Sequence, residues 1–285
     1  MKSKYLKIVF FGSSSYVIPI IEVLKKNFNL QIVITTGKFE TKPVPKYCIE
    51  NKIAYMPVET LSGKNLKSLI INHKSSIGVL ADFGLIVPKE ILNLFPKGII
   101  NIHPSLLPKY KGPTPVQTAI LNGEKITGVT LIKLDTQIDH GPILAQVKEE
   151  ILPQDTAQSL YSRLFKIGAE MLPKIIDRFF IGSLKPKAQN HQKATFTKIL
   201  KRRDGFIDIL NPPSAQALES MIRAYFPWPG VYTKLKMENE KFKIIKFLPN
   251  KKIQVEGKKP VSYKDFINGY PEQGKKLLEK LGFKY

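Results

Sequence analysis

The chain has 285 residues, and 45 lysines and arginines against 23 acidic residues give it a formal net charge of +22 at pH 7. This charge favours a polyanionic partner, because cations brought to phosphates release counterions, although many of the lysines are scattered enough to be ordinary solvated surface. A single cysteine, Cys48, excludes an internal disulfide and a cysteine-based zinc site, and no apolar run is long enough for a membrane span or a signal peptide, which indicates a cytoplasmic protein.

Strand-like and helix-like segments alternate along the first 180 residues. Short apolar runs predict strands at 7–11, 30–36, 54–58, 76–81, 98–103 and 128–134. Helical periodicity predicts helices at 17–24, 47–51, 66–72 and 115–122, and a long helix from Asp155 or Thr156 to Phe180. The core positions expected in this long helix are Leu160, Leu164, Ile167, Met171 and Ile175. The alternation predicts a mostly parallel, Rossmann-like α/β sheet covered on both faces, with ligands bound outside the carboxyl ends of its strands.

Polar side chains follow directly on one of these buried strands. Asn101 and His103 are two residues apart, so on a strand they project from the same face, and Asp139 follows the next predicted strand. An amide and a protonated imidazole can donate hydrogen bonds to a carbonyl oxygen that becomes negative during acyl transfer. Asp139 can hold the imidazole or relay a proton. The pattern predicts an acyl-transfer site without a covalent nucleophile, and its plain alternative is a hydrogen-bonded turn at a strand end.

The stretch from Gly98 to Gln146 resembles the active-site block of the folate-dependent formyltransferases. An Asn-x-His pair, a Ser-Leu-Leu-Pro turn and a later Asp mark that block, and all of them are present here. The resemblance implies a formyltransferase fold, 10-formyltetrahydrofolate as co-substrate, no metal, and catalytic roles for Asn101, His103 and Asp139. It also implies that the folate contacts one loop and one turn, with the residues Phe83, Leu85, Val87, Ser105, Leu106, Leu107 and Pro108.

The second half of the chain resembles the linker and C-terminal domain of those family members that formylate initiator methionyl-tRNA. The matching segments are 194–200, 204–208, 222–230 and 254–262. A helix is expected at 215–224, followed by strands at 232–237, 242–247 and 252–255. The resemblance implies a catalytic domain over 1–183, a linker over 184–205, and an OB-like tRNA-binding β-domain over 206–285.

The expected reaction is transfer of a formyl group from 10-formyltetrahydrofolate to the α-amino group of initiator methionyl-tRNA, by a monomer that serves translation initiation. The clustered cations Lys201, Arg202 and Arg203 are expected to contact the tRNA. The chain departs from the family pattern at 37–42, where a long basic loop is replaced by a short one, and after Phe247, where strands are missing. Both departures concern the acceptor, so a formyltransferase acting on a nucleotide-linked amino sugar remains an alternative. A tRNA-binding module without catalysis is less consistent with an intact triad.

Overall fold

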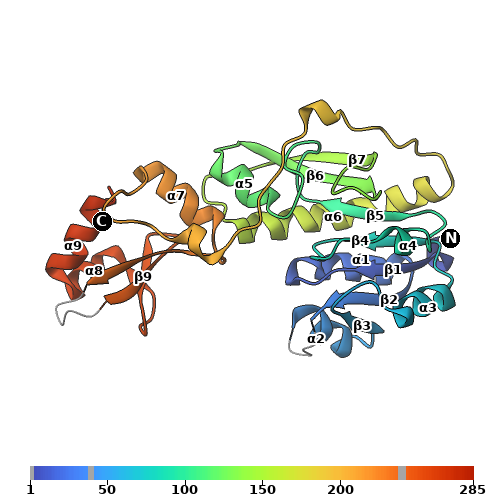
Figure 1. The fold of residues 1–285 in the computed structure, drawn as a ribbon, viewed down its shortest axis with the longest axis horizontal. Helices are drawn as coiled ribbons and strands as arrows, with labels where there is room; N and C mark the ends of the chain where they lie inside the picture. The colour runs from blue at the N-terminus through green and yellow to red at the C-terminus, as the bar shows by residue number, and fades with distance from the viewer. Residues whose placement is uncertain (1–2, 38–41, 237–241) are drawn as a thin grey trace. The chain divides into compact units, whose positions relative to one another are not determined.

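A computed structural model describes residues 3–37, 42–236 and 242–285, and the chain divides into two compact units (Figure 1). Unit 1 comprises residues 1–115, 126–150 and 161–197, and unit 2 comprises 116–125, 151–160 and 198–285. The last passage from unit 1 to unit 2 follows Thr197 and lies inside the predicted linker, 184–205. The predicted domain limits at 183 and 206 stay predictions. Residues 38–41 of the predicted short loop, and Met237 at the end of a predicted strand, lie outside the described residues.

Unit 1 is built on a seven-stranded sheet with the strand order β3-β2-β1-β4-β5-β6-β7. The strands are β1 (Lys7–Phe11), β2 (Asn29–Thr36), β3 (Tyr55–Val58), β4 (Ile77–Leu80), β5 (Ile99–His103), β6 (Ile126–Lys133) and β7 (Ile143–Glu150). The first five pair in parallel, and β6 pairs antiparallel with β5 and β7. Strand β5 is buried at every position, as expected for a strand covered on both faces. The predicted mostly parallel sheet is confirmed.

The edge strand β7 was not predicted, because its apolar run stops at Ala145 and four of its eight side chains are polar. Leu144 is its buried residue, and most of the positions after it are exposed. The strand pairs with β6 from Ile126 opposite Glu150 to Ile132 opposite Ile143. The connection between these two strands carries Asp139, so their pairing determines where this carboxylate lies.

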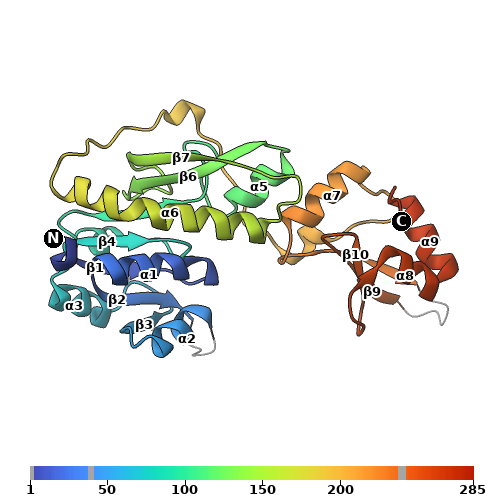
Figure 2. The same cartoon turned by 180° about the vertical axis from the view of Figure 1, so that it is seen from behind.

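Helices cover the sheet of unit 1, and Figure 2 shows α1 and α6 against the same face. The helices are α1 (Ile18–Asn27), α2 (Pro43–Glu50), α3 (Lys64–His73), α4 (Lys89–Leu92) and α6 (Ala157–Phe180), whereas α5 (Pro115–Leu121) falls almost entirely within unit 2. Thr156 caps α6, since its Oγ1 accepts the Ser159 N–H at 3.1 Å. Leu160, Leu164 and Ile175 of the predicted stripe are buried, whereas Ile167 and Met171 are only half-buried. Phe165, Ala169 and Leu172 are buried as well, and Phe165 stacks with Tyr16 and Tyr161.

Unit 2 contains a four-stranded antiparallel sheet with the order β11-β10-β9-β8. Its elements are α7 (Ala215–Ala224), β8 (Val231–Lys236), β9 (Phe242–Leu248), β10 (Lys252–Val255), β11 (Val261–Ser262), α8 (Tyr263–Gly269) and α9 (Pro271–Lys280). The predicted small C-terminal β-domain is confirmed as this separate sheet. Helices α8 and α9 were not predicted, although Ser262 caps α8 by accepting the Asp265 N–H and Pro271 opens α9.

Two further features can be stated for the part of the chain that the structure describes. No helix there combines the length and the apolar composition needed to cross a membrane. In the same ranges, no three His, Cys, Asp or Glu side chains are grouped in a way that could hold a metal ion.

Candidate active site

Strand β5 brings Asn101 and His103 to the edge of the sheet at which its parallel strands end. Asn101 lies opposite Leu80 of β4 and Ile132 of β6, and His103 lies opposite Thr130. Both polar residues are buried, with 6% and 4% of their surface exposed. Their spacing of two residues places them on one face of the strand, as predicted from the sequence.

Asp139 lies in the connection between β6 and β7 and contacts both of these residues. Its Oδ1 accepts a hydrogen bond from Asn101 Nδ2 at 3.2 Å, and its Oδ2 lies 3.4 Å from His103 Nδ1. The same Oδ2 accepts the backbone N–H of Gly112 at 2.8 Å. The structure therefore brings the three predicted catalytic side chains together around one carboxylate.

Both ring nitrogens of His103 face hydrogen-bond acceptors. Nε2 lies 2.9 Å from the carbonyl oxygen of Tyr110, and because a carbonyl only accepts, Nε2 carries a hydrogen and donates it. Nδ1 faces the Asp139 carboxylate, which is also an acceptor. The expected hydrogen bond from His103 to an oxyanion therefore requires His103 to exchange one of these partners.

Asn101 has donor capacity beyond its bond to Asp139. An amide nitrogen carries two hydrogens, and the bond to Asp139 Oδ1 uses one of them. Asn101 also lines a cavity of about 210 Å³ together with His103 and Asp139. Apolar and small residues form much of its wall, among them Leu80, Phe83, Gly84, Pro113, Tyr161 and Phe165. The amide thus lies where it can donate to a carbonyl group bound in this cavity.

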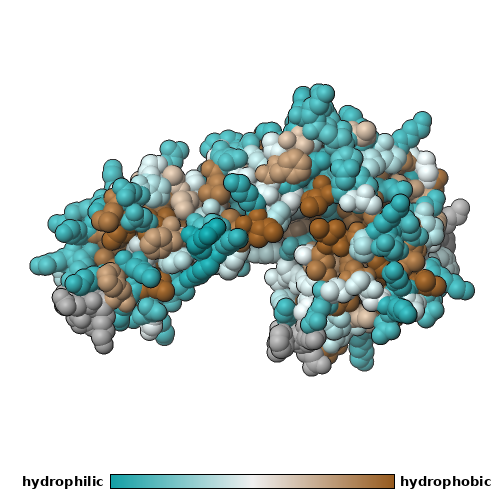
Figure 3. Space-filling model, viewed as in Figure 1, coloured by the Kyte–Doolittle hydropathy of each residue, from teal (hydrophilic) through white to brown (hydrophobic). Residues whose placement is uncertain are grey.

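A second cavity of about 130 Å³ shares Leu80, Asn101 and Asp139 with the first. Its wall is mainly apolar and includes Leu85, Ile86, Val87, Leu134 and Ile138. Apolar side chains gather on the face of unit 1 seen in Figure 3, where most of the surrounding surface is hydrophilic. A flat heterocycle of low polarity suits such a wall. The two cavities together offer an apolar site that ends at the triad.

The structure separates the predicted folate contacts into two groups. Phe83, Leu85 and Val87 line the two cavities. The turn Ser105, Leu106, Leu107 and Pro108 lines neither of them. Ser105 Oγ donates to the Lys109 carbonyl at 2.7 Å, and the backbone N–H of Leu107 donates to Thr130 Oγ1 at 3.1 Å. The turn thus supports the chain that leads to Tyr110, and its role in folate binding stays a prediction.

Four titratable side chains beside the triad were missed from the sequence. Lys111 is 2% exposed, and its Nζ lies 3.3 Å from His191 Nδ1. The His191 ring stacks on His140 at a centroid distance of 3.9 Å, and His140 Nδ1 lies 2.6 Å from Asp135 Oδ2. Burial lowers the pKa of Lys111, and the carboxylates of Asp139 and Asp135 act in the opposite direction. These residues come from three segments distant in sequence, so no local motif marks them.

The predicted tRNA contacts Lys201, Arg202 and Arg203 are exposed in unit 2. The Arg202 side chain is held by the protein itself: Nη1 donates to the Pro229 carbonyl at 2.7 Å, and the guanidinium lies 4.5 Å from the Tyr232 ring centroid. Lys201 and Arg203 have exposed side chains in the same short helical turn. The three cations therefore form one surface on which Arg202 also has a structural role.

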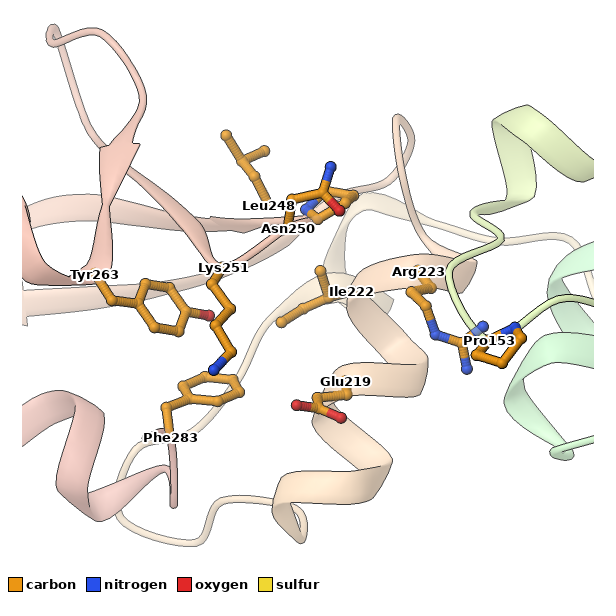
Figure 4. A pocket seen from close by; sticks show the side chains of 10 residues that line it. Pro153, Glu219, Ile222, Arg223, Leu248, Asn250, Lys251, Tyr263 and Phe283 are labelled. Carbon is orange, nitrogen blue, oxygen red and sulfur yellow. The ribbon is translucent and has the colours of Figure 1, made fainter. Parts of the chain in front are cut away.

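Unit 2 contains a cavity of its own, of about 180 Å³, drawn in Figure 4. Lys251 extends between Tyr263 and Phe283 in this view, while Arg223 points toward Pro153. Burial and, to a smaller extent, the Glu219 carboxylate raise the pKa of Tyr263. None of the residues predicted to be catalytic or to bind folate or tRNA lines this cavity, so it is separate from the triad.

The chain matches known proteins over most of its length. The family described as formyl transferase matches residues 6–176, which include the whole triad. A methionyl-tRNA formyltransferase of Chloroflexus aurantiacus is 38% identical over 80% of this chain and 76% of its own length. One of Koribacter versatilis is 32% identical over 95% of this chain and 98% of its own length.

Solved structures show the same fold at lower identity. A 4-N formyltransferase of Francisella tularensis superposes with a TM-score of 0.67 and 20% identity, over 86% of this chain and 98% of its own. A phosphoribosylglycinamide formyltransferase of Bacillus halodurans has a TM-score of 0.55 and 23% identity, over 62% of this chain and 96% of its own. At these identities the similarity concerns the fold alone.

Proposed function

The chain belongs to the formyl transferase family, and on that basis we propose that it transfers a formyl group from 10-formyltetrahydrofolate to the α-amino group of initiator methionyl-tRNA. The observation that carries the proposal is the convergence of Asn101, His103 and Asp139 on one cavity. Relatives named methionyl-tRNA formyltransferase at 32% to 39% identity support this acceptor.

The reaction forms a bond between the amino nitrogen of the acceptor and the formyl carbon and breaks the bond between that carbon and N10 of the folate. A proton leaves the attacking nitrogen, and N10 gains one. The remaining amide hydrogen of Asn101 stabilises the negative charge that develops on the formyl oxygen. Protonated His103 adds positive charge beside that oxygen, and Asp139 holds the imidazole and carries the proton between the two nitrogens.

The cavity walls fit the folate co-substrate. Leu85, Val87 and the exposed Ile86 border the cavity that reaches Asn101 and Asp139. An apolar wall of this kind packs against a ring system, while Asn101 and Asp139 supply polar groups in the same lining. We assign the folate ring to this cavity, with Phe83 buried beneath the same loop.

A two-acceptor assay tests the proposed function. Purified protein is incubated with 10-formyltetrahydrofolate and either initiator methionyl-tRNA or a nucleotide-linked amino sugar, and the formylated product is measured. We expect formylmethionyl-tRNA from the first mixture and no product above background from the second. Formylation of the sugar alone would replace the proposed acceptor by the alternative and leave the family membership unchanged.

The cation cluster in unit 2 gives a prediction about acceptor binding. Replacing Lys201, Arg202 and Arg203 by glutamine is expected to weaken tRNA binding and to reduce the slope of log affinity against log salt by up to about 3, since each lost phosphate contact removes roughly one unit. Arg202 donates a hydrogen bond to Pro229 and lies over the Tyr232 ring, so its replacement can also destabilise the fold. The melting temperature of the Arg202→Gln single variant is therefore measured alongside.

A control separates these cations from the general charge of the protein. Replacing three exposed lysines of unit 1, Lys52, Lys64 and Lys74, removes the same charge and is expected to leave the salt slope unchanged. An equal slope for both triple variants would show that the cluster is ordinary surface.

The proposal also includes a monomer that acts in the cytoplasm, where aminoacylated tRNA and folates are available. Size-exclusion chromatography tests whether the protein is a monomer.

A further inference from the structure

The segment that follows α6 lies against both loops that surround the triad. It has two anchor points, residues 187–189 and residues 195–197, with a short exposed turn at His191–Lys193 between them. We call residues 187–197 the strap. Figure 1 shows it within the extended, yellow to orange chain between α6 and α7. The strap belongs to unit 1 and lies beyond residue 176, where the match to the family ends.

The first anchor point holds the connection that bears Asp139. Lys187 and Ile143 exchange two backbone hydrogen bonds of 2.7 and 2.8 Å just after this connection. Gln189 Nε2 then donates to the carbonyl of Asp139 at 2.9 Å and to the carbonyl of Gly141 at 2.7 Å. Gln189 is 6% exposed, so these bonds are shielded from water, which strengthens them.

Asp139 needs support of this kind because its backbone is strained. Its φ is +47°, in the left-handed region that residues other than glycine rarely adopt. The neighbouring backbone is also tightly packed, since a Cβ at Gly141 would lie 1.8 Å from the Lys133 carbonyl oxygen. One amide group of Gln189 binds carbonyls on both sides of His140. It thereby restrains the peptide group between Asp139 and His140, which adjoins the Cα that bears the carboxylate.

The second anchor point holds the loop of residues 108–114. Lys111 donates its N–H to the Thr195 carbonyl at 2.8 Å and accepts the Thr197 N–H at 2.7 Å. The side chains contribute as well: Thr195 Oγ1 accepts the Tyr110 N–H at 2.8 Å, and Thr197 Oγ1 accepts the Thr114 N–H at 3.1 Å. Together with the bond from the Thr195 N–H to the Pro108 carbonyl, the strap thus bonds to the loop backbone along its whole length, from Pro108 to Thr114.

This second loop carries the remaining partners of the triad. The Tyr110 carbonyl accepts the hydrogen bond from His103 Nε2, and the Gly112 N–H donates to Asp139 Oδ2. The strap therefore holds one loop that carries Asp139 and another that orients both His103 and Asp139. A displacement of the strap would change the relative position of the imidazole and the carboxylate.

We propose that Gln189 is a positioning residue for formyl transfer, which acts by fixing the backbone that aims Asp139 at His103 and Asn101. The inference rests on the proposed function. Gln189 lines neither cavity at the triad, so its effect passes through Asp139. Misplacement of a reacting group by about 1 Å can cost roughly 10²-fold in rate, and that is the scale of effect the contacts predict.

The experiment compares three substitutions in the full chain. Gln189→Ala removes the amide group that donates to both carbonyls. Gln189→Glu keeps the side-chain volume but places carboxylate oxygens, which only accept, opposite the same two carbonyl oxygens. Gln192→Ala is the matched control, because this exposed glutamine lies on the turn between the anchor points. We expect kcat to fall about 10- to 100-fold in both Gln189 variants, with KM for the folate changed less than threefold and with Gln192→Ala equal to the wild type. A kcat within twofold of the wild type in Gln189→Glu would overturn the proposal.

A double-mutant cycle distinguishes positioning from general support of the fold. If Gln189 acts through Asp139, adding Gln189→Ala to Asp139→Asn should reduce kcat by less than twofold further. A full 10- to 100-fold loss on that background would contradict the proposed route. The melting temperature of each variant shows whether a loss reflects unfolding.

A readout without turnover separates this inference from the proposed function. Hydrogen exchange of a peptide covering residues 135–143 is expected to be at least about 10-fold faster in both Gln189 variants, since the carbonyls on either side of His140 lose their donor. Unchanged exchange would refute the positioning role whatever acceptor the enzyme uses. If exchange is faster in the Gln189 variants but the wild-type protein does not formylate methionyl-tRNA, only the proposed acceptor is refuted.

Discussion

Replacing Asp139 with asparagine is expected to lower kcat by about 10⁴-fold, the scale seen when an amide replaces a carboxylate that orients a catalytic imidazole. Both carboxylate oxygens accept hydrogen bonds, Oδ1 from Asn101 and Oδ2 from Gly112. An amide has one oxygen, so its NH₂ group must face one of these donors. The substitution also removes the negative charge beside His103 Nδ1. Single-turnover formylation with saturating folate and methionyl-tRNA measures the effect on the chemical step.

The control for this prediction is Glu170→Gln, which removes an exposed carboxylate on α6 and should leave kcat unchanged. Binding of the folate to Asp139→Asn should remain within severalfold of the wild type, because apolar residues form most of the cavity wall. A turnover within 10-fold of the wild type would exclude Asp139 from proton transfer and from orienting His103.

Replacing Asn101 with alanine is expected to lower kcat by about 10²- to 10³-fold, or roughly 3 to 4 kcal/mol of transition-state stabilisation. Asn101 is buried and lines both cavities at the triad. One amide hydrogen binds Asp139, and the second can stabilise the oxyanion. The loss should appear in kcat and not in the affinity for folate, because the oxygen becomes negative only during the reaction. Rapid-quench kinetics and folate binding measured by fluorescence separate the two.

Asn65→Ala, at an exposed position on α3, provides the control for removal of an amide. The melting temperature of Asn101→Ala must be compared with that of the wild type, since truncation also leaves Asp139 Oδ1 without this donor. Near-normal turnover together with intact folate binding would remove Asn101 from the mechanism.

The sequence predicted the part of the site that depends on local periodicity. Alternation along a strand predicts that Asn101 and His103 share a face. Both residues lie in β5, which pairs with β4 and β6 as a regular strand. The apolar run before them predicts a strand buried on both sides, which β5 is. Asp139 was predicted from its place after the next predicted strand, and the family resemblance implied the same catalytic role for it.

The interactions that hold the triad could not be predicted in this way. The Tyr110 carbonyl and the Gly112 N–H are backbone groups, which exist at nearly every position and mark no motif. Strand β7 lies at a sheet edge, where polar side chains such as Lys148 and Glu150 are exposed, so it has no continuous apolar run that would mark a buried strand. The sequence of the strap is typical of a polar linker, because its hydrogen bonds use backbone groups and the polar side chains of Gln189, Thr195 and Thr197.

The sequence alone determined the class of fold, the chemistry available at the end of β5, and the family to which the chain belongs. These follow from side-chain type and spacing, which are local properties. Only the tertiary structure decided that both ring nitrogens of His103 face acceptors, that Lys111 and two histidines lie beside the triad, and that the strap holds Asp139. Most of these contacts join segments that are far apart in the sequence, and the bond from His103 to Tyr110 spans only seven residues but uses a backbone carbonyl that no motif marks. Local sequence patterns encode contacts of neither kind. The convergence arises because strand pairing and burial bring these segments to the same edge of the sheet.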